Sequence, residues 1–178
     1  MKKIFLIYLI ATSILYGYNY NELLLKAQAS MFPKIMMLDK NLKNKLVDGY
    51  IVYTIVYNKN DYLIASEVKE SIEMIYKGKF DGYRYKINLV EFSNIKKQTR
   101  TSVFYVLNSS DEDIQQVAKF AKEQGIISFC YDENNLKDGL LFSLVLEKST
   151  VFYLNKNNLD TKKVNFVDSL LQMVRYID

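Results

Sequence analysis

Four polar side chains that follow two apolar runs are the strongest candidates for chemistry in this sequence. Ser109 and Ser110 follow one run, and Asp132 and Asn134 follow the next. If both runs are parallel strands, these hydroxyl, carboxylate and amide groups lie at the edge where open α/β sheets bind ligands. They offer donors and acceptors to a small polar ligand or to a partner protein. Asp and Asn are also common turn residues that need no ligand, so both explanations stay open.

The composition excludes several kinds of catalytic site. The chain has no histidine and a single cysteine, Cys130. A Ser-His-Asp or Cys-His nucleophile system therefore cannot form, and a zinc site lacks its usual nitrogen and sulfur ligands. The six glycines are scattered, so no glycine-rich loop presents backbone N–H groups to a phosphate. We expect no enzymatic activity, no metal and no cofactor.

Other polar groups have structural explanations. The acidic run 111–113 opens a predicted helix, where carboxylates interact favourably with the helix dipole. A phosphoacceptor receiver domain would need an acidic pocket for a divalent ion at its strand ends. The first and third predicted strands end instead in Asn58 and Asn108, which provide no carboxylate.

Alternating helices and strands must position the candidate residues. Within the first helix, Asn21 is the expected N-cap and Pro33 is expected to kink or restart the helix. Short connections and this alternation predict a single three-layer α/β domain, with a mainly parallel sheet flanked by helices. The predicted order is a helix at 21–38, a strand at 50–57, a helix at 64–75, strands at 83–92 and 101–107, a helix at 114–121 closed by Gly125, and a strand at 126–131.

The C-terminal part has a different pattern. Residues 140–146 and 151–154 are apolar runs joined by a short polar segment, which predicts an antiparallel hairpin at the margin of the sheet. Residues 166–177 place Phe166 and Leu170 on one helical row. We therefore predict a final helix that docks on the sheet or on a partner subunit.

The first 17 residues have the organisation of a secretory signal peptide. Two lysines precede the apolar run 4–15, and Gly17 precedes a polar stretch. A transmembrane helix needs roughly 20 apolar residues, which makes an uncleaved anchor the weaker alternative. No cysteine follows the run at the position of a lipoprotein anchor. We expect cleavage after Gly17 and a periplasmic domain, residues 18–178, without stable membrane insertion.

Export changes the interpretation of charge and of the cysteine. Removing residues 1–17 takes away two lysines and no acid, which lowers the net charge from +4 to +2. A nearly neutral chain gives no electrostatic reason to expect nucleic acid binding, and the pair Lys162-Lys163 is expected to be solvated loop charge. One cysteine cannot form an intrachain disulfide. We favour a buried, inert thiol for Cys130 over an intermolecular disulfide.

The chain resembles the YfiR family of small periplasmic proteins from residue 18 to residue 178. The likeness is distributed, and it is clearest in a glycine-led apolar strand, a charged turn, a strand that closes on Leu-Asn and a segment with paired leucines. The residues that carry it are Lys26-Ala27, Phe32-Pro33-Lys34, Ser109-Ser110, Tyr131-Asp132, Gly139 to Asn155, Phe166, Leu170 and Leu171. The family's disulfides cannot form within a chain whose single cysteine is Cys130, and so redox sensing is not transferred.

The resemblance implies a regulatory role. Members of this family are exported, can form homodimers, and in one arrangement bind the periplasmic domain of an inner-membrane diguanylate cyclase and repress it. Envelope signals then alter cyclic-di-GMP and biofilm formation, and other family domains are fused to sensor kinases. We therefore expect a periplasmic signalling module that acts by protein contact. The alternative is a small solute-binding protein that uses Ser109, Ser110 and Asp132.

Overall fold

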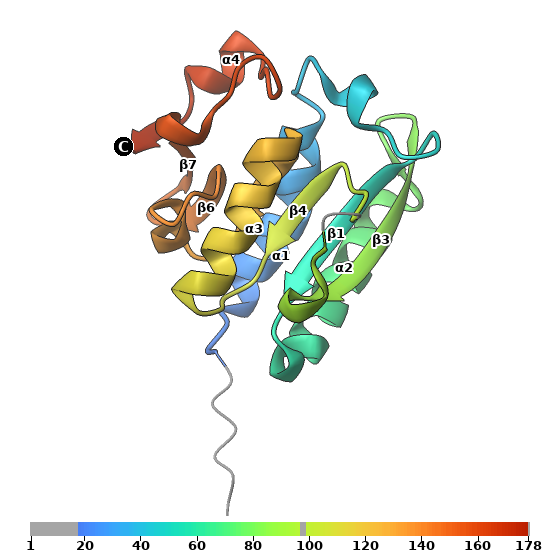
Figure 1. Ribbon diagram of the computed structural model, residues 1–178, viewed down its shortest axis with the longest axis vertical. Helices are drawn as coiled ribbons and strands as arrows, with labels where there is room; N and C mark the ends of the chain where they lie inside the picture. The colour runs from blue at the N-terminus through green and yellow to red at the C-terminus, as the bar shows by residue number, and fades with distance from the viewer. Residues whose placement is uncertain (1–17, 97–98, 178) are drawn as a thin grey trace, which may run out of the picture.

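The apolar runs of the sequence form an eight-stranded sheet, and the segments with helical spacing pack against it (Figure 1). The computed structural model describes residues 18–96 and 99–177. The strands are β1 (Ile51–Tyr57), β2 (Lys79–Phe80), β3 (Tyr83–Glu91), β4 (Val103–Val106), β5 (Ile127–Cys130), β6 (Phe142–Leu146), β7 (Thr150–Asn155) and β8 (Arg175–Ile177). The α-helices are α1 (Glu22–Met36), α2 (Tyr62–Tyr76), α3 (Asp111–Gln124) and α4 (Asp168–Leu171).

The predicted signal peptide lies outside the described residues. Within residues 18–96 and 99–177, no helix combines the length and the apolar character that a membrane crossing requires.

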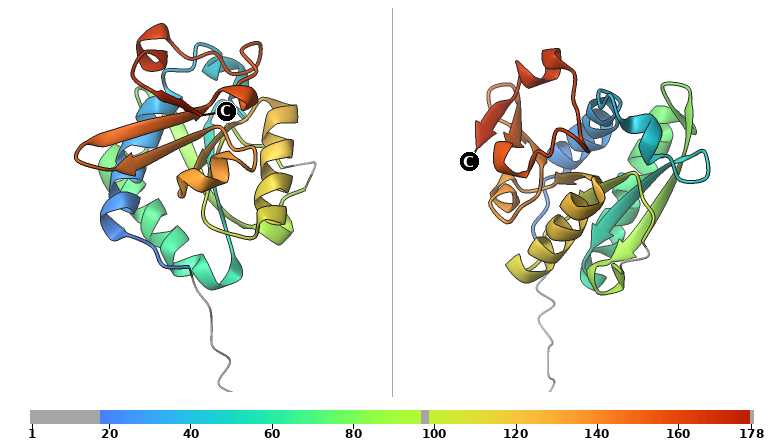
Figure 2. Two further views of the ribbon diagram at one scale, coloured as in Figure 1. Left: turned by 90° about the vertical axis from the view of Figure 1, so that its left-hand side faces the viewer. Right: turned by 45° about the horizontal axis from the view of Figure 1, so that its top comes forward.

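The sheet has the strand order β2-β3-β1-β4-β5-β6-β7-β8. Strands β3, β1, β4, β5 and β6 run parallel, β6 and β7 form the predicted antiparallel hairpin, and β8 pairs parallel with β7. The chain adds strands in one direction from β1 through α2, and in the other from β4 through α3. Because such crossovers are right-handed, α2 lies with α1 on one face and α3 covers the other (Figures 1 and 2). This confirms the predicted α/β architecture.

Burial explains the apolar character of the central strands. Every residue of β1 is buried, as expected for a strand that is covered on both faces. The larger apolar cluster fills the space between α1, α2 and the sheet, where Phe32 stacks on Phe129 with ring centroids 4.4 Å apart. The smaller cluster lies between α3 and the opposite face. Strand β3, near the sheet margin, alternates between partly buried and exposed residues over most of its length.

Local capping sets the ends of the long helices. The Asn21 side chain caps α1, as predicted, and the Ser110 side chain caps α3. Gly125 ends α3 in the left-handed region, with φ of 69°. Pro33 does not restart the first helix, because α1 continues through it to Met36. The buried side chains of Phe32 and Met36 on either side of Pro33 hold this last turn against the sheet, so tertiary packing overrides the local cost of the proline.

The predicted helix at 166–177 is wrong. The segment forms one helical turn, α4, and then the edge strand β8, which pairs with β7 from Tyr153 to Asn155. Phe166 and Leu170 are buried against the larger core cluster, so the expected docking on the sheet does occur. A helix continued to Ile177 would leave this stretch of the β7 backbone without a partner, and the ladder to β8 satisfies those groups.

Gln28 joins α1 to the point where the sheet changes from parallel to antiparallel. Strands β5 and β6 pair over only two positions, because β5 ends there at Cys130 while β6 continues to Leu146. The fully buried Gln28 side chain donates from Nε2 to the carbonyl oxygens of Tyr131 and Leu144, each at 2.9 Å. Its Oε1 accepts from the Tyr105 hydroxyl at 2.5 Å. One glutamine thus satisfies three buried polar groups from three strands or strand ends.

Gln28→Ala should destabilise the fold strongly, because it leaves two carbonyls and one hydroxyl buried without partners. We expect a loss of roughly 3 kcal/mol in the free energy of unfolding. The exposed Gln116→Ala on α3 is the matched control, with an expected change within about 0.5 kcal/mol. Urea denaturation followed by circular dichroism measures both; equal effects of the two substitutions would contradict this role of Gln28.

Candidate functional site

The candidate site lies where the direction of strand addition reverses, between the carboxyl ends of β1 and β4. Open α/β sheets bind ligands at this kind of position. Asn58 follows β1, and its Nδ2 donates to the Asn108 carbonyl at 3.1 Å and to the Ser109 hydroxyl at 3.0 Å. The starts of α1 and α3 lie at the same edge of the sheet (Figure 1). Polar groups that follow β1 and β4 therefore meet here, beside the starts of α1 and α3.

Tyr20, from the segment that leads into α1, lies at this site. We call the space between the ends of β1 and β4 that is bordered by Asp61 and Asn108 the crevice. The hydroxyl of Tyr20 donates to Asp61 Oδ2 at 3.0 Å and accepts from the Asn108 N–H at 3.1 Å. Its ring packs edge-on against Tyr131, with centroids 4.8 Å apart. The Tyr131 hydroxyl in turn accepts from the Asn21 N–H at 2.7 Å. The start of the described chain is thus bound across the ends of β1, β4 and β5.

The two predicted serines lie at this edge and are engaged within the chain. The Ser109 hydroxyl donates to Asp113 Oδ2 at 2.5 Å and accepts from Asn58. The Ser110 hydroxyl accepts from the Asp113 N–H at 3.3 Å, as the cap of α3. Both side chains therefore hold the loop between β4 and α3 in place.

The other two predicted residues form a local turn. Asp132 Oδ1 accepts from the N–H and from Nδ2 of Asn134, both at 2.9 Å, and so caps the 3-10 helix Glu133–Leu136. A contact of 3.5 Å between the side chains of Asn135 and Asn108 links this turn to the end of β4. Asp132 and Asn134 thus lie at the predicted edge, with a structural role in the turn.

Sequence reasoning missed Tyr20 and Asp61, whose side chains are hydrogen-bonded to each other at this edge of the sheet. They are 41 positions apart, so no local motif joins them. One signal was available for Tyr20, because an aromatic residue directly before an N-cap often packs against a neighbouring element. Asp61 stands at the N-cap position of α2 but makes no capping hydrogen bond with its side chain.

Burial dominates the electrostatics of Asp61. The residue is 3% exposed, and desolvation raises the pKa of its carboxyl above the ordinary value, while the hydrogen bond from Tyr20 acts in the opposite direction. Desolvation and the neighbouring Asp61 carboxylate raise the pKa of Tyr20 well above its ordinary range. Tyr20 therefore remains a neutral phenol that both donates and accepts.

A hollow of about 450 Å³ lies at the opposite edge of the sheet, where the parallel strands begin. Among the residues that the structure describes, the cations that line it are Lys45 and Arg100, and both have acidic partners: Lys45 Nζ lies 2.6 Å from Asp39 Oδ2, and Arg100 lies 3.3 Å from Asp48 Oδ1. The C-terminus of α3 also borders this hollow and disfavours anions. This hollow is therefore a poor anion site.

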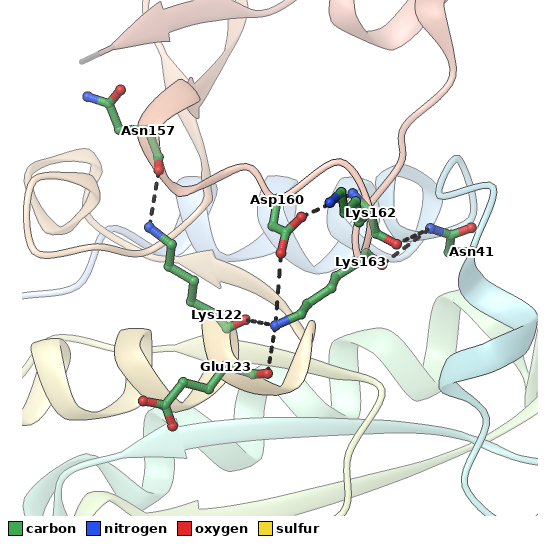
Figure 3. Close-up of polar contacts among 7 residues, drawn as sticks. All are labelled: Asn41, Lys122, Glu123, Asn157, Asp160, Lys162 and Lys163. Carbon is green, nitrogen blue, oxygen red and sulfur yellow. Dashed lines mark hydrogen bonds and ion pairs between the residues drawn. The ribbon is translucent and has the colours of Figure 1, made fainter.

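Lysines beside this hollow stabilise the end of α3 (Figure 3). Lys163 Nζ donates to the carbonyls of Glu123 at 2.9 Å and Lys122 at 3.4 Å, and lies 3.9 Å from Asp160 Oδ2. Such contacts satisfy the last carbonyls of a helix and complement its dipole. Lys163 is exposed in a turn, as expected for a solvated loop charge, and its ammonium group also caps the end of α3.

Cys130 is fully buried in β5. Its thiol donates to the Phe142 carbonyl at 3.5 Å, and burial raises its pKa well above the ordinary value. This placement agrees with the favoured prediction of a buried thiol. Within the part of the chain that the structure describes, no group of three or more histidine, cysteine or acidic side chains is arranged to hold a metal ion.

Comparison with known proteins shows the fold alone. No protein family and no curated protein matches the chain. A conserved domain protein from Vibrio cholerae O1 biovar El Tor is similar over 86% of this chain, with 13% identity and a TM-score of 0.58. A Streptococcus pneumoniae ABC domain solved in complex with L-Trp is similar over 81% of this chain, with 11% identity and a TM-score of 0.51. The chain spans 60% and 62% of the length of these two structures.

Asp61 should make stability depend on pH. Because folding raises its pKa, its contribution to stability is full below the ordinary carboxyl value of about 3.9 and is lost as pH rises through the raised value. Asp61→Asn should flatten this decline. Tyr20→Phe should steepen it, because the hydrogen bond that lowers the pKa is removed. Denaturation midpoints measured from pH 3 upward give the slope of stability against pH for each variant, and the exposed Glu112→Gln is the surface control. If Asp61→Asn and Tyr20→Phe changed this slope in the same direction, the assignment would be contradicted.

Cys130 should be inert in the native protein. A thiol-disulfide exchange reagent is expected to react with Cys130 at least about 100-fold more slowly in the native protein than in the urea-unfolded chain. The reagent cannot reach the buried sulfur, and burial keeps the sulfur in its unreactive thiol form. Non-reducing electrophoresis should show only monomer. Rapid native labelling, or a disulfide-linked dimer, would favour the intermolecular alternative.

Proposed function

We propose that the chain is an exported periplasmic regulatory module that acts by protein contact through the outer surface of α1 and α2. The observation that carries this proposal is the exposure of large apolar side chains on one helical layer. Leu23, Leu63 and Met74 are 70%, 72% and 71% exposed. Exposed apolar side chains around a groove are typical of protein interaction sites.

A groove between α1 and α2 has one of these exposed side chains, Met74, in its lining. It has a volume of about 170 Å³, with the buried Leu25 and Val68 also in its lining. Glu67 and Glu70 line the α2 side and are exposed, while the α1 side carries an ion pair of one acid and one base. An apolar floor with an acidic wall matches a partner that presents apolar anchors flanked by basic residues.

The acidic wall also bears on the choice of partner. Two copies that met through this groove across a two-fold axis would bring Glu67 and Glu70 close to the same residues of the other copy, and like charges would repel. A homodimer therefore fits another surface better. We assign the groove to a different protein: the periplasmic domain of an inner-membrane diguanylate cyclase or sensor kinase, as the family resemblance implies.

Met74→Asp should weaken the contact with the partner. The wild-type chain, used as bait on solubilised inner membranes, is expected to recover a cyclase or sensor kinase. Met74→Asp should reduce that recovery at least about tenfold, because a charge replaces an apolar anchor. Met173→Asp is the matched control, since Met173 is 61% exposed and lies near the C-terminus. Recovery of no signalling protein, or equal loss with both variants, would contradict the proposal.

A second candidate function is the binding of a small solute at the strand-end crevice. Two observations favour it: the convergence of polar groups between β1 and β4, and the likeness to a domain that was solved with L-Trp. A ligand that binds the native state raises its melting temperature by mass action. Thermal-shift measurements with L-Trp and a panel of metabolites test this role, and a panel without any shift would remove it.

A further inference from the structure

The crevice between β1 and β4 is filled by a side chain that is not part of the sheet or its helices. Tyr20 precedes the N-cap of α1, and the helix itself begins at Glu22 with its own cap from Asn21. The ring and hydroxyl of Tyr20 can therefore leave the crevice without any helical hydrogen bond being broken. At a position where open α/β sheets bind ligands, an element of the chain itself stands in the ligand's place.

The groups around the Tyr20 hydroxyl define what fits there. The Asp61 carboxylate accepts at 3.0 Å and the Asn108 N–H donates at 3.1 Å, and both contacts meet on one oxygen atom. Within residues 18–96 and 99–177, Tyr20 is the single hydrogen-bond partner of the Asp61 carboxylate. If the hydroxyl left without replacement, a buried carboxylate and a backbone N–H would both lose their partner, which is costly.

Alternatives to a hydroxyl fit less well. An ammonium group can donate to Asp61 but cannot accept from the Asn108 N–H, and a carboxylate is repelled by Asp61. A hydroxyl does both with one atom. The Tyr131 ring, 4.8 Å from the Tyr20 ring in an edge-on arrangement, adds a partner for an aromatic group. The crevice thus matches the combination of a hydroxyl with an aromatic ring.

We propose that this crevice is a binding site for a phenol-bearing small molecule, and that Tyr20 is its intramolecular occupant. The ligand hydroxyl takes the place between Asp61 and Asn108, its ring packs on Tyr131, and the segment 18–20 is displaced. The inference is a sharper form of the solute-binding role and rests on it, but it is independent of the contact role of α1 and α2.

Competition with Tyr20 has a measurable consequence. A phenol can enter the crevice only when the Tyr20 ring has left it. If this open state is populated for only a fraction of the time, the apparent affinity of the chain for the phenol falls by that fraction. Removing the Tyr20 ring should therefore increase the affinity for a phenol. The wild-type chain should still bind the same phenol, more weakly, and ligand binding should expose Tyr20.

The experiment measures binding of p-cresol and of toluene to the wild-type chain, Tyr20→Ala and Tyr18→Ala by calorimetry and thermal shift. Tyr18 is the matched control because it lies in the same segment and is 44% exposed. Tyr20→Ala should bind p-cresol at least about tenfold more tightly than the wild type and Tyr18→Ala. It should also prefer p-cresol over toluene about fivefold or more, because only p-cresol satisfies Asp61 and Asn108.

Each other outcome has a definite meaning. Equal affinity of Tyr20→Ala for toluene and p-cresol would show an apolar hole only and would overturn the proposal, as would equal affinity of wild type and Tyr20→Ala for p-cresol. If Tyr20→Ala does not fold, Tyr20→Phe replaces it, with a smaller increase in p-cresol affinity expected. A metabolite shift that neither Tyr20→Ala nor Asp61→Asn alters would leave solute binding in place and remove the phenol site.

Discussion

The hydrogen bonds of Gln28 are the constraint on which the rest of the molecule depends. The parallel pairing of β5 with β6 stops after two positions, because β5 ends there while β6 continues into the hairpin with β7. The carbonyls of Tyr131 and Leu144 are then buried without a strand partner, and a single amide group from α1 satisfies both. This arrangement sets the position of α1 along the sheet as well as the place where the hairpin departs.

The same constraint shapes the candidate site. Tyr131 is bound at both ends to the first half of α1: its carbonyl accepts from Gln28 and its hydroxyl accepts from the Asn21 N–H. With α1 held in this way, Tyr20 points into the gap between β1 and β4 and meets Asp61 and Asn108. The core and the crevice are therefore coupled through one tyrosine. A change in the packing of α1 would be felt at the strand ends.

Local patterns predicted most of the architecture. Continuous apolar runs predicted the buried strands, and the Asn21 cap predicted where α1 begins. The prediction of a helix at 166–177 was wrong, because the end of this segment forms strand β8 and pairs with β7. The alternative of a helix restart at Pro33 also did not occur, because packing of the flanking residues holds the last turn of α1. In both cases a long-range contact outweighed a local preference, since local propensities are worth less than burial and strand pairing.

From the amino-acid order alone follow the prediction of export, the α/β alternation, the exclusion of histidine-based chemistry and the edge of the sheet at which polar residues gather. These depend on composition and on periodicity, which are local properties. Tertiary structure decided how the polar groups pair. Gln28 shows no hydrophobic period, and its partners lie 77 to 116 positions away; Tyr20 and Asp61 come from different elements. A buried hydrogen bond requires two groups to meet, and only the packed fold specifies which two.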